Sequence, residues 1–219
     1  MQKLNLAFHK ICKNPQGDWQ VNPKYFWEIF DWCNHNYTNF RIYFDDGDKL
    51  DELSGKHGII AKHCTLAIVT DNIGKKGYYS WDELKQMKQK GFTISSHSVS
   101  HSSMCWFDNN GILLANPSMG KYDNCPRGKQ LLSENQIKYQ LVESKKILNN
   151  HGFDTNEFVF PYGLYSDQTI EILDNLGIYK YYTTCDEKLY DGGKLVPRIL
   201  IYGTKSPTKT IKCLTNLTN

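Results

Sequence analysis

The alternation of strand-like and helix-like segments is the feature that most constrains the fold of this chain. Seven short runs rich in β-branched or aromatic residues predict strands at 4–9, 40–44, 64–70, 92–96, 157–160, 179–183 and 195–201. Apolar residues at helical spacing lie between several of them, as in the stripe of Phe26, Ile29, Phe30 and Cys33. Strands separated by helices pair in parallel through right-handed crossovers. The sequence therefore predicts an α/β fold of about seven strands, either a doubly wound sheet or a barrel.

Three of the expected helices carry start and stop signals. A serine suited to capping a helix begins each of them, at Ser80, Ser133 and Ser166. A glycine follows the last apolar position of each, at Gly91, Gly152 and Gly177. Ser80 and Ser133 are each followed three residues later by Glu or Gln, which is the pattern of a capping box.

Composition limits the class of protein. The chain has 219 residues, of which 40% are hydrophobic and 22% charged, enough for one sizeable core, so a single domain over 1–219 is expected. The net charge of +3 comes from scattered lysines without a basic stripe, which argues against nucleic-acid binding. The seven cysteines include no CxxC pair, which favours reduced thiols.

The sequence offers no membrane or export signal. No run approaches the roughly 20 apolar residues of a membrane span. The first residues, MQKLNLAFHKIC, are too short and too polar for the apolar part of a signal peptide. We therefore expect a cytoplasmic protein.

Two polar clusters follow predicted strands. The tetrapeptide FDDG places Asp45 and Asp46 after the strand at 40–44, and HSVSH places His97 and His101 after the strand at 92–96. Taken alone, FDDG is better explained as an ordinary turn, and HSVSH as two surface or capping histidines. Ligands bind at the carboxyl ends of parallel strands, however, and two histidines with one carboxylate form a metal site with open positions. One aspartate can ligate the cation, which then keeps its neighbour ionised as a base.

A long stretch at 102–132 shows no clear periodicity. It is rich in Asn, Gly and Pro but also holds Trp106 and Phe107, which could contact a sugar or simply be core residues. A loop of this length inside a compact domain is usually functional, and we expect an insertion that acts as a lid or binding loop. Cys105 and Cys125 flank part of it and could pair.

Four segments together resemble one family. FDDG at 44–47, CTLAIVTDNIG at 64–74, WDELKQMKQKGFTISSHSVSH at 81–101 and FVFPYG at 158–163 are similar, in order and spacing, to the successive motifs of polysaccharide deacetylases with the NodB homology domain, carbohydrate esterase family 4. The resemblance implies a distorted (β/α) barrel and a divalent metal, zinc by preference, held by Asp46, His97 and His101. It also implies that Asp45 is the general base and that the backbone N–H of Tyr162 stabilises the oxyanion. Pro161, Tyr162 and Trp106 are the candidates for contact with the substrate.

The chain departs from the usual family pattern at the general acid. The family supplies this group from a late Leu-x-His motif, whereas no histidine follows His151 here. The opening segment LNLAFHKI at 4–11 resembles instead the first strand of the circularly permuted branch, the poly-β-1,6-N-acetylglucosamine deacetylases, so the resemblance assigns the acid role to His9. A histidine satisfied in the core is the alternative.

A second departure concerns an arginine. The usual Arg-x-Pro-Tyr-Gly motif reads Val159-Phe160-Pro161-Tyr162-Gly163 here, so the arginine that orients the base is absent. Arg198, in LVPRILI, could reach the base from elsewhere, because a guanidinium binds a carboxylate well. It could equally be a surface or interface arginine.

The expected function is a metal-dependent hydrolase that uses water to remove N-acetyl groups from amino sugars of a glycan or glycoconjugate. Two alternatives stay open. The same site could cleave a small non-sugar amide, and the two departures could mark a catalytically silent glycan-binding protein. The sequence does not predict an oligomeric state.

Overall fold

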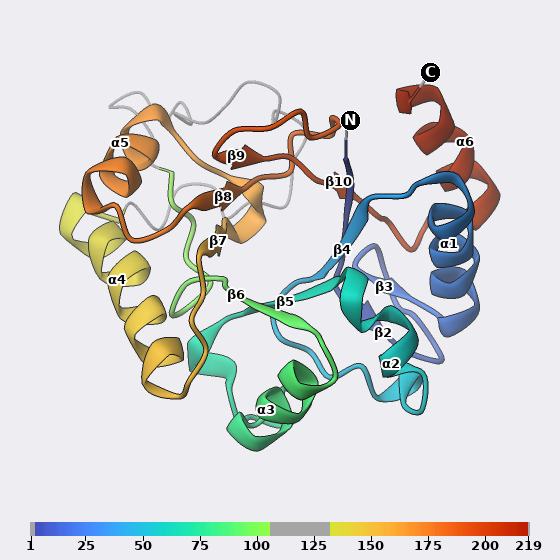
Figure 1. Cartoon of the computed structure of the whole chain (residues 1–219), viewed down its shortest axis with the longest axis horizontal. Helices are drawn as coiled ribbons and strands as arrows, with labels where there is room; N and C mark the ends of the chain where they lie inside the picture. The colour runs from blue at the N-terminus through green and yellow to red at the C-terminus, as the bar shows by residue number, and fades with distance from the viewer. Residues whose placement is uncertain (1–2, 106–131, 219) are drawn as a thin grey trace.

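The fold is built on one parallel sheet. The computed structural model describes residues 3–105 and 132–218 (Figure 1), so Trp106, Phe107, Cys125 and most of the expected 102–132 insertion lie outside the described residues. The sheet has eight strands in the order β10-β1-β4-β5-β6-β7-β8-β9, and every neighbouring pair is parallel. The strands are β1 (Leu4–Phe8), β4 (Phe40–Phe44), β5 (Cys64–Ile68), β6 (Thr93–Ser96), β7 (Glu157–Val159), β8 (Tyr181–Thr183), β9 (Leu195–Val196) and β10 (Ile199–Leu200).

The two edges of this sheet are joined by the chain itself. The single strand expected at 195–201 is in fact two short strands, β9 at one edge and β10 at the other, separated by Pro197 and Arg198. Proline cannot donate a ladder hydrogen bond, which explains the break. Asn5 Nδ2 in β1 donates to the Pro197 carbonyl at 3.1 Å and fixes the joint. The sheet therefore curls into a distorted barrel, which confirms the predicted fold class and selects the barrel over the open sheet.

Helices surround the curled sheet (Figure 1). They are α1 (Pro23–Asn36), α2 (His57–Ile60), α3 (Trp81–Gln89), α4 (Glu134–Asn150), α5 (Asp167–Leu176) and α6 (Pro207–Thr218). The predicted caps at Ser80, Ser133 and Ser166 are confirmed, with full capping boxes at the first two. The short α2 and the terminal α6 were not predicted, and neither were the two-residue strands β2 (Lys10–Ile11) and β3 (Gln20–Val21).

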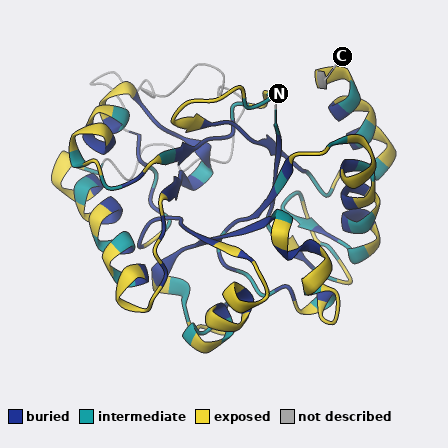
Figure 2. Cartoon of the chain, in the orientation of Figure 1, coloured by how far each residue is buried: buried dark blue, intermediate teal, exposed yellow. Residues whose placement is uncertain are grey.

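The core lies between these helices and the sheet. Figure 2 shows buried strands and helices whose exposed residues face outward. The stripe predicted on α1, Phe26, Ile29, Phe30 and Cys33, is buried as expected. The Phe26 ring packs 5.4 Å from that of Phe8 and 5.6 Å from that of Phe44, so α1 anchors β1 and β4, the strands that lead into His9 and into FDDG.

Two further expectations concern cysteines and membranes. Cys12, Cys33, Cys64, Cys185 and Cys213 are free thiols, which agrees with the expected reduced cysteines. Within residues 3–105 and 132–218, no helix combines the length and apolarity needed to cross a bilayer.

The segment between β2 and β3 is held against the chain that follows β10. The Gly203 N–H donates to the Asp18 carbonyl at 2.7 Å, and a Cβ added to Gly203 would lie 1.9 Å from the Gln20 carbonyl oxygen. Only glycine allows this approach of two backbones. This contact sets the position of Trp19, which lines the pocket described below.

Gly203→Ala is therefore expected to lower the free energy of unfolding by about 1–3 kcal/mol, because the added methyl must push two backbones apart. Urea denaturation followed by circular dichroism measures this. Gly58→Ala is the matched control, because Gly58 lies in α2 with nothing within 4 Å of the added Cβ, and it should be neutral or slightly stabilising. Equal unfolding midpoints for the two variants would contradict the contact.

Candidate active site

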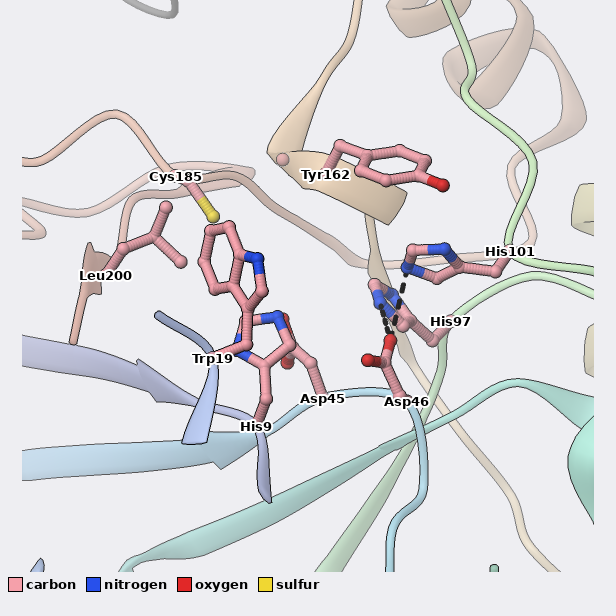
Figure 3. Close-up of a pocket in the computed structure, with 10 residues that line it drawn as sticks. His9, Trp19, Asp45, Asp46, His97, His101, Tyr162, Cys185 and Leu200 are labelled. Carbon is pink, nitrogen blue, oxygen red and sulfur yellow. Dashed lines mark ion pairs between the residues drawn. The ribbon is translucent and has the colours of Figure 1, made fainter. Parts of the chain in front are cut away.

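A pocket of about 210 Å³ opens at the carboxyl ends of the strands. The ends of four strands supply part of its lining: His9 follows β1, Asp45 and Asp46 follow β4, His97 follows β6, and Cys185 lies two residues after β8. In Figure 3 the Asp46, His97 and His101 side chains form one side, Trp19, Cys185 and Leu200 the other, and His9 and Asp45 lie between them. The structure thus brings the two predicted polar clusters together with His9.

Asp46, His97 and His101 converge. Asp46 Oδ1 lies 3.2 Å from His101 Nε2 and 3.6 Å from His97 Nε2, and the ligand atoms all lie within 4.8 Å of one another. His97 Nδ1 lies 2.8 Å from the Val159 carbonyl oxygen. Because a carbonyl only accepts, Nδ1 carries the proton and Nε2 faces Asp46. A backbone carbonyl behind a histidine ligand is the usual way to fix this tautomer.

These three residues fit a divalent cation. Asp46 Oδ1 is buried and has no hydrogen-bond partner among the described residues. Burial, reinforced by the neighbouring His97, lowers the pKa of His101 to about 4, so its ring is neutral near pH 7. Burial alone would raise the pKa of Asp46, but its contact with His97 and the positive charge of the histidines when protonated hold that pKa below its ordinary value. Ligand atoms of one carboxylate and two imidazoles therefore lie around a common centre, as zinc-type ions require.

The backbone at this site adopts unusual conformations. Asp46 (φ 71°), Ser98 (φ 70°), His101 (φ 57°) and Tyr162 (φ 59°) lie in the left-handed region, which non-glycine residues rarely adopt. Of the described non-glycine residues, Glu187 alone joins them. Ser98 Oγ accepts the His101 N–H at 2.9 Å and supports the strained turn. Strain concentrated at a pocket is typical of functional sites.

Asp45 forms a buried ion pair with Arg198. Arg198 Nη1 donates to Asp45 Oδ1 at 2.7 Å, and these residues are 0% and 3% exposed. Arg198 Nε also donates to the Thr184 carbonyl at 3.1 Å. Burial would raise the pKa of Asp45, but the Arg198 guanidinium, with His97 and His9, outweighs it and holds the pKa below its usual range. Arg198 is therefore not a surface residue, and it lies beside the aspartate that the usual motif arginine would orient.

His9 and Trp19 lie against each other. Their ring centroids are 4.7 Å apart, and Trp19 in turn lies 5.5 Å from Tyr202. His9 Nδ1 is buried without a hydrogen-bond partner in the described part of the chain. Trp19, Cys185 and Leu200 were not predicted as site residues, because none of them belongs to a local motif. Only the fold brings them to the pocket.

The segment Pro161–Gly163 is a short 3₁₀ turn over the pocket. The Tyr162 ring lies 4.5 Å from that of His101, while Pro161 is buried and does not line the pocket. A Cβ added to Gly163 would lie 2.6 Å from Cys185 Cβ, so glycine is needed where the turn meets the end of β8. Trp106, the remaining candidate for substrate contact, lies outside the described residues.

The sequence of this chain is similar to those of known proteins. The model of the polysaccharide deacetylase family matches residues 41–181. YxkH of Bacillus subtilis (strain 168), named as a polysaccharide deacetylase, is 23% identical over 147 residues, which are 65% of this chain and 43% of that protein. This chain thus aligns with less than half the length of that relative.

Solved structures share the fold. The Streptococcus pyogenes deacetylase PplD in complex with acetate has a TM-score of 0.69 at 19% identity, covering 97% of this chain and 98% of that one. IcaB from Ammonifex degensii has a TM-score of 0.67 at 17% identity, covering 91% of each chain. A polysaccharide deacetylase from Bacillus cereus has a TM-score of 0.68 at 18% identity, covering 98% of this chain and 69% of that one.

The buried ion pair predicts how stability depends on pH. Arg198→Met leaves the Asp45 carboxylate buried without its partner and should lower the free energy of unfolding by about 3–5 kcal/mol at pH 7. Since the folded pKa of Asp45 lies below its unfolded value of about 3.9, the pair stabilises the protein above that pH. This contribution is lost as the pH falls through the folded pKa.

Urea denaturation of wild type and Arg198→Met at pH 7 and pH 3 measures the effect, and the deficit should shrink at pH 3. The double variant Asp45→Asn/Arg198→Met is the control. It should be more stable at pH 7 than Arg198→Met alone, because no buried charge is left unpaired. A deficit independent of pH would contradict the ion-pair account.

Proposed function

The chain belongs to the polysaccharide deacetylase family, and from this premise we propose that it is a metal-dependent hydrolase that removes N-acetyl groups from amino sugars of a glycan or glycoconjugate. One observation carries the proposal: a convergent Asp46–His97–His101 set lies in the same pocket as an aspartate paired with a buried arginine. The three-residue set suits a zinc-type cation, and the paired aspartate suits the role of general base.

In this proposal the acetamide lies across the pocket. A divalent cation held by Asp46, His97 and His101 would polarise the acetamide carbonyl and favour the ionisation of water. The acetyl methyl would face the apolar side, where Leu200 and Cys185 pack with Trp19. The methyl is small, which suits a pocket of about 210 Å³.

Asp45 acts as the general base. Arg198 engages Oδ1, so Oδ2 is the oxygen that takes a proton from the attacking water. The lowered pKa of Asp45 keeps it ionised before the reaction. As the water oxygen bonds to the carbonyl carbon, negative charge develops on the carbonyl oxygen, and the backbone N–H of Tyr162 is the donor that would stabilise it.

His9 acts as the general acid. The amide nitrogen must gain a proton before the C–N bond breaks and the amine and acetate separate. His9 lines the same pocket as Asp45, and Trp19 packs against its ring. Because both groups lie in one pocket, Asp45 can take a proton from the attacking water and His9 can give one to the leaving amine of the same substrate.

The metal assignment predicts about one zinc-type ion per chain. Elemental analysis of purified protein should find it in the wild type and in His35→Ala, whose histidine is exposed on α1. His97→Ala should lose it, because one of the three ligands is gone. Acetate release from N-acetylglucosamine oligomers should require the metal and fall with it. Bound metal with no acetate release from any oligomer would contradict the proposed substrate, and a metal-free wild type would contradict the site.

The acid assignment predicts a loss of rate without a loss of metal. His9→Gln should lower kcat for acetate release by about 10²–10⁴-fold, since the leaving amine loses its proton donor. Metal content should stay at the wild-type level, because His9 is not among the three ligands. Activity within a few-fold of wild type would remove His9 from the mechanism.

A further inference from the structure

A second buried carboxyl group lies in the barrel interior. Glu157, the first residue of β7, is 7% exposed, and its carboxylate accepts hydrogen bonds from three hydroxyl groups. Tyr43 Oη donates to Oε1 at 2.7 Å, Ser95 Oγ donates to Oε2 at 2.9 Å, and Thr183 Oγ1 also donates to Oε1. Three donors around one acidic group suit a carboxylate, which only accepts hydrogen bonds. None of these four residues lines the pocket.

The bond between Tyr43 and Glu157 crosses the barrel. Tyr43 lies in β4 and Glu157 in β7, and β5 and β6 separate these strands in the sheet. Adjacent strands lie about 4.8 Å apart, so a 2.7 Å contact over three strand spacings must span the concave side. Tyr43 packs there with the small side chains of Ala67 and Val159, which leave room for it.

Tyr43 also contacts Arg198, the ion-pair partner of Asp45. The Arg198 guanidinium lies over the Tyr43 ring, with Cζ 5.0 Å from the ring centroid. The edges of the guanidinium are bonded to Asp45, to the Thr184 carbonyl and to Cys185 Sγ. The N–H groups of a guanidinium point outward in its plane, so these three hydrogen bonds restrict its position. The Tyr43 ring adds a contact to the cation outside these three hydrogen bonds and restricts its orientation further.

The hydrogen bond to Glu157 strengthens this contact. A phenol that donates to a carboxylate gains electron density in its ring, which attracts a cation more strongly. The same bond fixes the position of the tyrosine oxygen and so the orientation of the ring. Contacts thus run without a gap from Glu157 through Tyr43 and Arg198 to Asp45 Oδ1.

We propose that Glu157 and Tyr43 are positioning residues for the reaction, which set the orientation of Arg198 and through it the carboxylate of Asp45. The proposal rests on the function proposed above, because Asp45 must be the base. Neither residue lines the pocket in which the substrate would lie. Their loss should therefore reduce the rate of the chemical step and leave substrate affinity and metal content unchanged.

The test compares two variants that each remove one hydroxyl from the same carboxylate. Tyr43→Phe keeps the ring over Arg198 but loses the bond to Glu157, whereas Ser95→Ala loses a bond to the opposite oxygen and does not contact Arg198. With acetate release from N-acetylglucosamine oligomers as the assay, Tyr43→Phe should lower kcat by about tenfold or more, with KM within twofold. Ser95→Ala should keep kcat within about twofold. Equal kcat losses in both variants, or none in either, would overturn the proposal.

A second measurement does not need activity. Urea unfolding midpoints of Tyr43→Phe, Arg198→Met and the double variant form a cycle. Coupling between the tyrosine hydroxyl and Arg198 predicts that the double variant loses less than the sum of the two single shifts. Additive shifts would overturn the coupling, whether or not the wild type releases acetate. The absence of acetate release would instead contradict the proposed function. Glu157→Gln replaces Tyr43→Phe in the cycle if that variant does not fold.

Discussion

The buried ion pair between Asp45 and Arg198 is the interaction on which the pocket depends. Neither charge would be stable alone at this depth, so each requires the other in one geometry. The two residues are 153 positions apart in the chain. Their contact depends on the link between the two edge strands of the sheet. The chain breaks at Pro197, β9 and β10 lie at opposite edges, and Arg198 lies between them. A strand running unbroken through 195–201 could not pair at both edges.

The parallel sheet explains why the other groups gather. Because every strand of the sheet runs in the same direction, residues from distant parts of the sequence leave it at one end. The strained turns at Asp46 and His101 then direct these side chains inward, and the left-handed turn at Tyr162 lies above them. The rigid barrel supports this strain, and the left-handed residues are concentrated where the proposed chemistry requires exact placement.

Much of this arrangement is predictable from local sequence. The strand at 40–44, the serine caps and the buried stripe of α1 follow from short-range patterns, and so does the choice of Asp45, Asp46, His97 and His101 as candidates. Arg198 could be predicted only as one of two alternatives, because its partner is fixed by barrel closure. Trp19, Cys185 and the Glu157–Tyr43 bond were not predictable, since each depends on contacts across the fold and has no motif of its own. The division of 195–201 into two strands had a local signal in Pro197, but the assignment of the two halves to opposite edges of the sheet depends on the fold.

The most direct test is anomalous diffraction at the zinc absorption edge, on crystals of the protein grown with zinc. The account predicts one strong anomalous peak at about 2.0–2.2 Å from Asp46 Oδ1, His97 Nε2 and His101 Nε2, with the Asp45–Arg198 pair intact beside it. An anomalous peak at another site, or an ordered pocket that stays empty at saturating zinc, would contradict it.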